Sequence, residues 1–186
     1  VTLAIALLAA GGATRFGGGK LDAMLAGKPL GRWALDAARA VPHERLAVVV
    51  GNPVPVFADG CELLVNKLAA EGLGTSAALA ARWAAGSDAL LLMLADMPLV
   101  SPATLRKLAE ARLPAAVAYP GGKPGAPACF PSALFPALEA LTGDAGAAQV
   151  LRGFLDVTLL EIPAEELRDV DRAEDLADVA AMLRSR

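Results

Sequence analysis

The sequence predicts an α/β fold, a three-layer, doubly wound and mostly parallel sheet, on three observations. Short apolar runs alternate along the chain with longer amphipathic segments. The apolar runs are hydrophobic at consecutive positions, which is typical of strands buried on both faces. The resulting strand-helix-strand order favours a parallel sheet with right-handed crossovers. Because 186 residues suffice for one core and are too few for two ordinary domains, we expect a single domain over 1–186.

The expected elements follow this order. Strands are predicted at 3–9, 45–51, 61–65, 88–95 and 115–119, and helices at 29–41, 74–86 and 101–113. The helix at 101–113 has the clearest start, because Ser101 can cap it and Pro102 suits its first turn. Further along, we expect a Gly/Pro loop at 121–130 leading into a short strand, the segment 131–141, a turn at 142–146, another helix, a strand at 157–162 and a closing helix after 169.

Composition excludes several classes of partner and chemistry. The formal charge is -3, with acidic and basic residues mixed along the chain, so duplex nucleic acid is not an expected partner. No apolar stretch approaches the roughly 18 residues of a membrane helix, so no membrane partner is expected. Cys61 and Cys129 form no CxxC pair, which fits a reducing cytoplasm and signals neither zinc nor a disulfide. His43 is the only histidine and lies in a turn-like segment, so we interpret it as structural.

A glycine-rich loop, LLAAGGATRFGGGKL at 7–21, follows the first predicted strand. It is not a P-loop, because Thr14 stands at the first glycine position and Leu21 at the hydroxyl position. Thr14 also replaces the middle glycine of a dinucleotide motif counted from Gly12. Exposed backbone N–H groups together with Arg15 and Lys20 suit a triphosphate. The alternative for this stretch alone is a surface loop with solvated charges.

Asp96 favours the phosphate interpretation. It follows a strongly apolar strand and precedes a Met-Pro step, so we expect it at the sheet edge where ligands of such folds bind. A carboxylate there can join Mg²⁺ to substrate phosphates, and such sites use one or two carboxylates. The candidates for the second acid are Asp169, Asp171, Glu174 and Asp175. The alternatives are a turn-capping role for Asp96 and a helix-capping role for the later acids.

Together these residues resemble a known family pattern. The motifs are LAAGGATRFGGGK at 8–20, LADMP at 94–98 and DVDRAEDL at 169–176, supported by similar segments at 66–81, 122–127 and 142–147. They resemble the nucleotidyltransferase family that completes the molybdenum cofactor by joining CMP or GMP to molybdopterin. The resemblance spans nearly the whole chain and implies a Rossmann-like fold of the nucleotide-diphospho-sugar transferase type.

The resemblance also implies roles for individual residues. The nucleotide would be bound by Ala9, Ala10, Gly11, Gly12, Arg15, Lys20, Asn66, Gly74, Ser76 and Asp96. Arg15, Lys20 and Asp96 would be catalytic, with Asp96 and Asp171 as the ligands of Mg²⁺; Asp169 is the other candidate for the second ligand. Asn52 is a weaker nucleotide-binding candidate. In the implied reaction the terminal phosphate of molybdopterin attacks the α-phosphorus in line and expels pyrophosphate.

The sequence departs from the family pattern on the acceptor side. Ala148 replaces a usual arginine, Ala126 a usual histidine, and Gly74 a usual serine. CTP is favoured over GTP because the LAAG motif and the segment at 72–76 resemble the cytidylyl branch, although ADMP resembles the guanylyl branch. The alternatives are GTP, a sugar phosphate as acceptor, and a non-catalytic NTP-binding accessory protein. A molybdoenzyme or its chaperone is the expected macromolecular partner.

Overall fold

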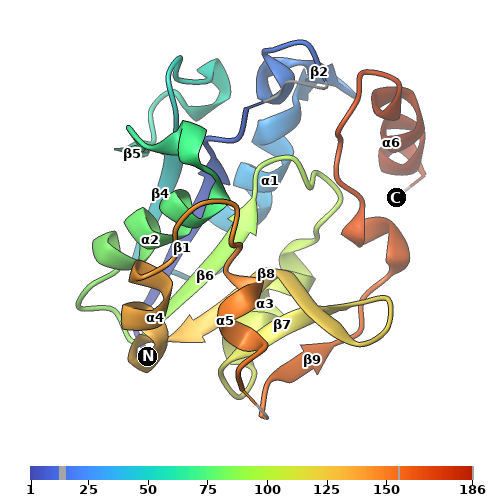
Figure 1. Ribbon diagram of the computed structural model, residues 1–186. Coiled ribbons are helices and arrows are strands. Elements are labelled where there is room, and N and C mark those ends of the chain that lie inside the picture. The colour runs from blue at the N-terminus through green and yellow to red at the C-terminus, as the bar shows by residue number, and fades with distance from the viewer. Residues whose placement is uncertain (13–15, 155, 186) are drawn as a thin grey trace.

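The computed structural model describes residues 1–12, 16–154 and 156–185. A seven-stranded sheet of order β5-β4-β1-β6-β8-β7-β9 crosses the molecule (Figure 1). Its strands are β1 (Leu3–Ala9), β4 (Arg45–Val50), β5 (Glu62–Val65), β6 (Ala89–Leu94), β7 (Ala115–Tyr119), β8 (Lys123–Pro131) and β9 (Thr158–Leu160). Strand β8 is antiparallel to β6 and β7, and the remaining pairs are parallel. The predicted three-layer, doubly wound and mostly parallel sheet is therefore confirmed.

Helices cover both faces of this sheet. Side chains of α1 (Leu30–Arg39) and α3 (Pro102–Glu110) join one buried cluster with β1 and β6. Those of α2 (Leu73–Trp83), α4 (Phe135–Glu139) and α5 (Ala148–Leu151) join the cluster on the opposite face. A small two-stranded sheet, β2 (Met24–Leu25) with β3 (Lys28–Pro29), contacts the last helix, α6 (Asp175–Arg184). Within the described ranges, no helix combines the length and apolar character that crossing a bilayer requires.

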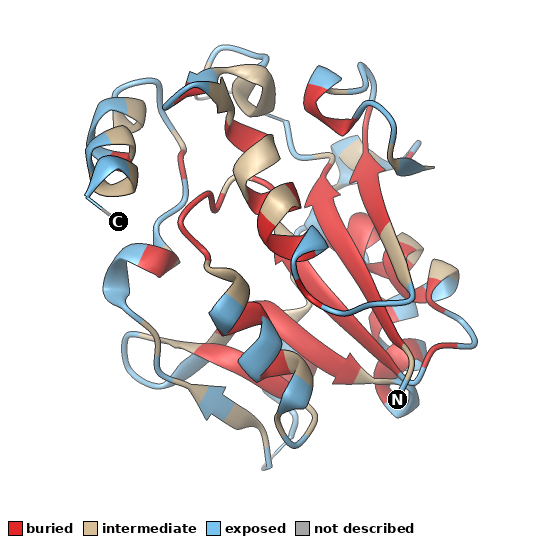
Figure 2. Cartoon of the chain, turned by 180° about the vertical axis from the view of Figure 1, so that it is seen from behind, coloured by how far each residue is buried: buried red, intermediate tan, exposed pale blue. Residues whose placement is uncertain are grey.

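Strand β1 shows why consecutive apolar residues were informative. Leu3, Ile5 and Leu7 belong to the α1/α3 cluster, while Ala4 and Leu8 belong to the α2/α4 cluster. Alternate side chains of a strand point to opposite faces, so a strand covered on both sides needs apolar residues at every position. Strand β1 is accordingly buried along its whole length, and its neighbours β4 and β6 along most of theirs (Figure 2).

The expected start of α3 is also confirmed. Thr104 N donates a hydrogen bond to Ser101 Oγ at 3.1 Å, with Pro102 in the first turn. The buried Glu166 adds a second acceptor, because its Oε2 receives hydrogen bonds from Ser101 N at 2.9 Å and Thr104 Oγ1 at 2.7 Å. The hydrogen-bond donors at the N-terminal end of α3 thus find acceptors in one nearby and one distant side chain.

One expected loop is instead a strand. The Gly/Pro segment at 121–130 forms most of β8, because Phe130 and Cys129 are fully buried between β6 and β7. The ladder with β7 shifts register between Ala116 and Val117, which leaves Ala126 and Pro127 without paired residues. A proline has no N–H to donate, so an irregularity of this kind accommodates it inside a central strand.

Candidate nucleotide-binding site

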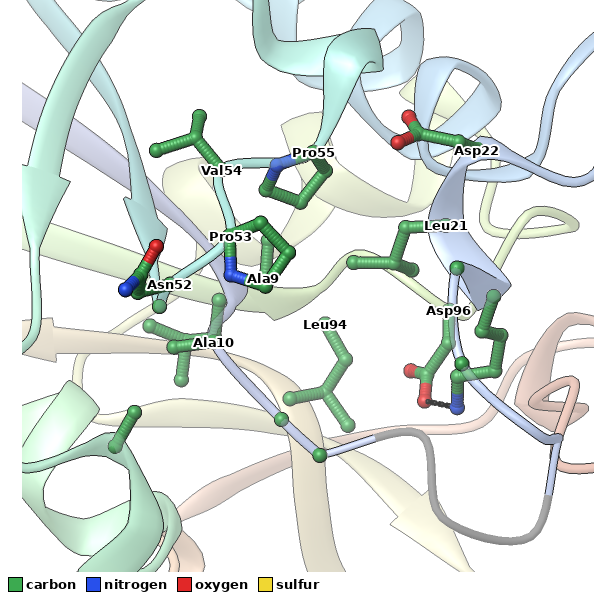
Figure 3. Close-up of a pocket in the computed structure, with 18 of the residues that line it drawn as sticks. Ala9, Ala10, Leu21, Asp22, Asn52, Pro53, Val54, Pro55, Leu94 and Asp96 are labelled. Atoms are coloured by element: carbon green, nitrogen blue, oxygen red, sulfur yellow. Dashed lines mark hydrogen bonds and ion pairs between the residues drawn. The ribbon is translucent and has the colours of Figure 1, made fainter.

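A cleft of about 610 Å³ opens where the carboxyl ends of β1, β4 and β6 meet (Figure 3). Parallel α/β sheets bind ligands in the crevice beyond these strand ends, where the strand order reverses. The lining residues are Leu8, Ala9, Ala10, Gly11, Gly12, Gly18, Gly19, Lys20, Leu21, Asp22, Gly51, Asn52, Pro53, Val54, Pro55, Ala69, Ala70, Leu73, Leu94, Asp96 and Asp171. The glycine-rich loop and the two acidic motifs therefore meet at one place.

Three charged side chains converge at this cleft. Lys20 Nζ lies 2.8 Å from Asp96 Oδ2, the ion pair drawn as a dashed line in Figure 3. The same nitrogen lies 3.8 Å from Asp171 Oδ1. Lys20 begins the short helix η1 (Lys20–Asp22), and Asp96 lies two residues after β6. Residues from three distant parts of the chain thus form one polar cluster, here called the Lys20–Asp96–Asp171 cluster.

Asp171 is brought to the cluster by its neighbour Val170. The N–H of Val170 donates to the carbonyl oxygen of Asp96 at 3.0 Å, and its side chain is fully buried against Leu99 and Val179 of α6. The carboxylate of Asp175 accepts a hydrogen bond from the N–H of Asp171 at 3.0 Å. Asp175 therefore stabilises the loop that carries Asp171 and does not line the cleft. Docking of α6 therefore positions Asp171.

Asp169 differs from Asp171 in its surroundings. It does not line the cleft, and burial together with the charges of Asp171 and Asp96 raises the pKa of its carboxyl group. Excess negative charge of this kind is reduced when a cation binds nearby. Asp96 and Asp171 supply the hard oxygen donors that Mg²⁺ prefers. Among the residues that the structure describes, no group of three or more His, Cys, Asp or Glu side chains could hold a metal ion.

Asp22 is a cleft residue that sequence reasoning missed. Its carboxylate accepts hydrogen bonds from the N–H groups of Val56 and Phe57, both at 2.8 Å. These N–H groups begin the short helix η2 (Val56–Ala58), in the connection between β4 and β5 that supplies Asn52–Pro55 to the cleft wall. Asp22 therefore ties the segment that carries Lys20 to the opposite wall. No local pattern reveals such a cap, because donor and acceptor are more than 30 residues apart.

Three predicted nucleotide-binding residues lie beside the cleft without lining it. Asn66 is buried, and its Nδ2 donates to Thr75 Oγ1 at 2.8 Å and to Ser76 Oγ at 2.9 Å. A side chain on Gly74 would meet the carbonyl oxygen of Thr142 at 2.8 Å, so the turn after α4 packs directly on this glycine. In this structure these residues connect the start of α2 to the segment after β5 and to the turn after α4.

The remaining predicted residues are placed as follows. Ala9, Ala10, Gly11 and Gly12 line the cleft next to the end of β1, and Asn52 lines it from the end of β4. Arg15 lies outside the described residues. The described part of the predicted triphosphate site therefore consists of the loop backbone, Lys20 and the two aspartates.

The sequence resembles several known proteins. The chain matches the model of the MobA-like NTP transferase domain over residues 5–162. The purine catabolism protein PucB of Bacillus subtilis is 33% identical over 186 residues, covering 90% of this chain and 91% of PucB. The bifunctional protein GlmU of Rhodospirillum rubrum is 39% identical over 132 residues, covering 67% of this chain. The matched region spans only 30% of that GlmU.

Solved structures share the architecture over nearly the whole chain. The homologue of Mycobacterium tuberculosis Rv0371c from Mycobacterium sp. strain JC1 has a TM-score of 0.81 at 26% identity, covering 99% of this chain and 98% of that chain. Rv0371c in complex with manganese has a TM-score of 0.76 at 25% identity, covering 97% and 99%. Because the family model spans most of the sequence and the motifs that suggested it meet at one cleft, this chain belongs to the MobA-like NTP transferase family.

Proposed function

We propose that the protein is a nucleotidyltransferase that moves an NMP group from an NTP to a phosphorylated acceptor and releases pyrophosphate. The favoured donor is CTP and the favoured acceptor is the terminal phosphate of molybdopterin. The observation that supports this most is the Lys20–Asp96–Asp171 cluster at the mouth of a glycine-lined cleft. Backbone donors, one ammonium and two carboxylates are the groups that a metal-bound triphosphate requires.

The lining residues would share the binding of the nucleotide. Backbone groups of Ala9–Gly12 would approach the base and phosphates, and Lys20, with Arg15, would neutralise the triphosphate. Asp96 and Asp171 would hold a divalent cation, and a relative crystallised with manganese supports this class of ion. When bound, such a cation supplies charge neutralisation and orientation at the α-phosphate and the leaving pyrophosphate. Asn66, Gly74 and Ser76 would act from behind the cleft wall, by holding the start of α2.

The chain itself would contribute positioning rather than covalent chemistry. The residues that line the described cleft include no serine, threonine, cysteine, histidine or tyrosine that could act as a nucleophile. Cys129 is fully buried in the core, and the ring of His43 hydrogen-bonds to the carbonyl oxygen of Val41. Direct in-line attack of the acceptor phosphate on the α-phosphorus fits this composition, with catalysis from alignment and charge neutralisation.

The test is release of pyrophosphate from the purified protein with Mg²⁺, an NTP and molybdopterin, in parallel with calorimetric titration of CTP and GTP. We expect CTP to bind and to release pyrophosphate only when molybdopterin is present. Turnover with GTP would assign the guanylyl reaction, and turnover with glucose 1-phosphate a sugar-phosphate acceptor. Nucleotide binding without turnover would identify an accessory protein. Failure of both nucleotides to bind would contradict the proposal.

If the molybdopterin reaction is the function, a molybdoenzyme or its chaperone would receive the product in the cytoplasm. Co-purification of the protein with such a partner, dependent on CTP, would test this part of the proposal separately.

A further inference from the structure

Two segments of the chain carry the proposed metal ligands. Asp96 begins the segment 96–101, which leads from β6 into α3. Asp171 ends the segment 166–171, which leads from the short helix η5 (Ala164–Leu167) toward α6. The second segment belongs to the orange-to-red trace between β9 and α6 in Figure 1. We call them the two ligand segments, and the way they are joined sets how the two aspartates lie relative to each other.

Two hydrogen bonds join the ligand segments at opposite ends. The N–H of Val170 donates to the carbonyl oxygen of Asp96 at 3.0 Å. The N–H of Ser101 donates to Oε2 of Glu166 at 2.9 Å. The start of each segment thus faces the end of the other, so the two segments run antiparallel, with one hydrogen bond beside the aspartates and the other at the far end.

Apolar side chains of both ligand segments pack in shared clusters. Leu99 and Val170 are fully buried together with Val179 of α6. Val100 is buried in the α1/α3 cluster, against which Leu167 packs. Hydrophobic contacts are non-directional, whereas a hydrogen bond requires a defined distance and angle. The two hydrogen bonds therefore set the alignment of one segment along the other.

Glu166 contributes more than a helix cap. The N-terminal end of α3 already has a local cap, the hydrogen bond from Thr104 N to Ser101 Oγ. Glu166 is only 6% exposed, and no Lys or Arg in the described part of the chain forms an ion pair with it. Burial of a carboxylate is costly, and here only the hydrogen bonds from Ser101 N and Thr104 Oγ1 offset that cost. What this buried group adds is a connection to a residue 65 positions away.

We propose that Glu166 is a positioning residue, which holds Asp171 where it can share a divalent cation with Asp96. Glu166 does not line the nucleotide cleft, so it acts through the segment 166–171. Distances between a metal and its ligands tolerate changes of only about 0.2 Å. A ligand segment joined to its partner by one hydrogen bond instead of two would hold the Asp171 carboxylate less precisely. This inference rests on the proposed nucleotidyl transfer.

The experiment titrates the full chain with CTP by calorimetry, once with Mg²⁺ and once with EDTA. The ratio of the two affinities measures the contribution of the metal. Glu166→Ala is expected to lower this ratio by about tenfold, as loss of a residue that supports a metal ligand does, and to leave the affinity in EDTA unchanged. Ser101→Ala is the matched control, because it removes the Oγ cap of the same helix end and keeps the N–H that Glu166 accepts. Its ratio should equal that of the wild type.

Two further variants separate the reach of the side chain from its charge. Glu166→Gln keeps the length and an acceptor oxygen but not the charge, and it should retain the wild-type ratio. Glu166→Asp keeps the charge but is one methylene shorter, and it should behave like Glu166→Ala. The opposite order would show that the negative charge of Glu166 acts on the metal and would overturn the positioning role. These two variants decide the question even where Glu166→Ala does not fold.

Hydrogen exchange tests the same inference without nucleotide. The amide proton of Val170 should exchange faster in Glu166→Asp than in Ser101→Ala, because the ligand segments are then joined at one end only. Equal exchange in the two variants, or a wild-type ratio in Glu166→Asp, would refute the positioning role and leave the nucleotide site intact. A wild-type protein that binds CTP equally well with Mg²⁺ and with EDTA would refute the proposed metal site as well.

Discussion

The Nζ atom of Lys20 lies 2.8 Å from Oδ2 of Asp96, although the two residues are 76 positions apart in the sequence. The Lys20 side chain is 12% exposed and that of Asp96 22% exposed, so water screens this pair less than a surface ion pair. Asp171 is within 3.8 Å of the same nitrogen. A change at any one of the three residues therefore alters the charge that an incoming nucleotide and metal encounter.

Replacing Lys20 by alanine is expected to weaken binding of CTP with Mg²⁺ by about 10- to 100-fold, because one charge-assisted contact to phosphate is worth about 1.5–3 kcal/mol. Isothermal titration calorimetry measures the effect. The exposed Lys107 on α3 is the matched control, and Lys107→Ala should retain the affinity. Equal affinities of the two folded variants would remove Lys20 from the triphosphate site.

Asp171 and Asp169 should differ as metal ligands, since only Asp171 lines the cleft. We expect Asp171→Asn to raise, by about tenfold or more, the Mg²⁺ concentration that half-saturates pyrophosphate release, because a carboxylate ligand is lost. Asp169→Asn should change it much less. The reverse order would assign the metal to Asp169 and show that the loop rearranges when substrate binds.

Asp22→Ala is expected to lower the free energy of unfolding by about 1–2 kcal/mol, as loss of a helix cap does, because two N–H groups of η2 lose their acceptor. Urea denaturation measures this. The variant should also bind CTP more weakly, because the segment that carries Lys20 is no longer hydrogen-bonded to the opposite wall of the cleft. Asp22→Glu should restore part of both losses, and Asp59→Ala, at an exposed position just after η2, should cause neither.

The two cysteines should react very differently with a thiol reagent at pH 8. Burial raises the pKa of the Cys129 thiol to about 12, so almost no reactive thiolate is present. Cys61 is only half-buried. We expect DTNB to modify Cys61 in the folded protein and Cys129 only after unfolding, and Cys61→Ser to abolish the reaction of the folded state. Rapid reaction in the Cys61→Ser variant would show that the core around Cys129 opens.

Asp36 should make stability depend on acid pH. Burial alone would raise the pKa of its carboxyl group, but ion pairs with Lys28 and Arg32 hold it below the usual 3.8. A lowered pKa stabilises the fold above the usual value, and this contribution is lost as pH falls through the folded value. The deficit in unfolding free energy of Asp36→Asn, measured with urea, should therefore be present at pH 6 and shrink below pH 3.8.

Local patterns were sufficient where a residue's neighbours decide its structure. Strands β1 and β7 begin and end where their apolar runs do, and the cap of α3 follows from Ser101 and Pro102. At β8 the expectation of a Gly/Pro loop leading into a short strand was right only in part, because Lys123–Pro131 is a single strand paired with both β6 and β7. Glycine and proline usually mark loops, and the pairing with distant strands leaves no local pattern.

By itself the sequence determined the fold class and the family, since hydrophobic periodicity and short motifs can be recognised from the sequence alone. It also indicated that glycines, a lysine and aspartates would line the cleft. Tertiary structure alone decided which acid faces the cleft, because the hydrogen bond from Val170 to the Asp96 carbonyl and the burial of Val170 set the direction of Asp171. It also decided that Asp22 joins the segment that carries Lys20 to the connection between β4 and β5 on the opposite wall of the cleft. These are contacts between segments distant in sequence, and their geometry exists only once the helices have packed on the sheet.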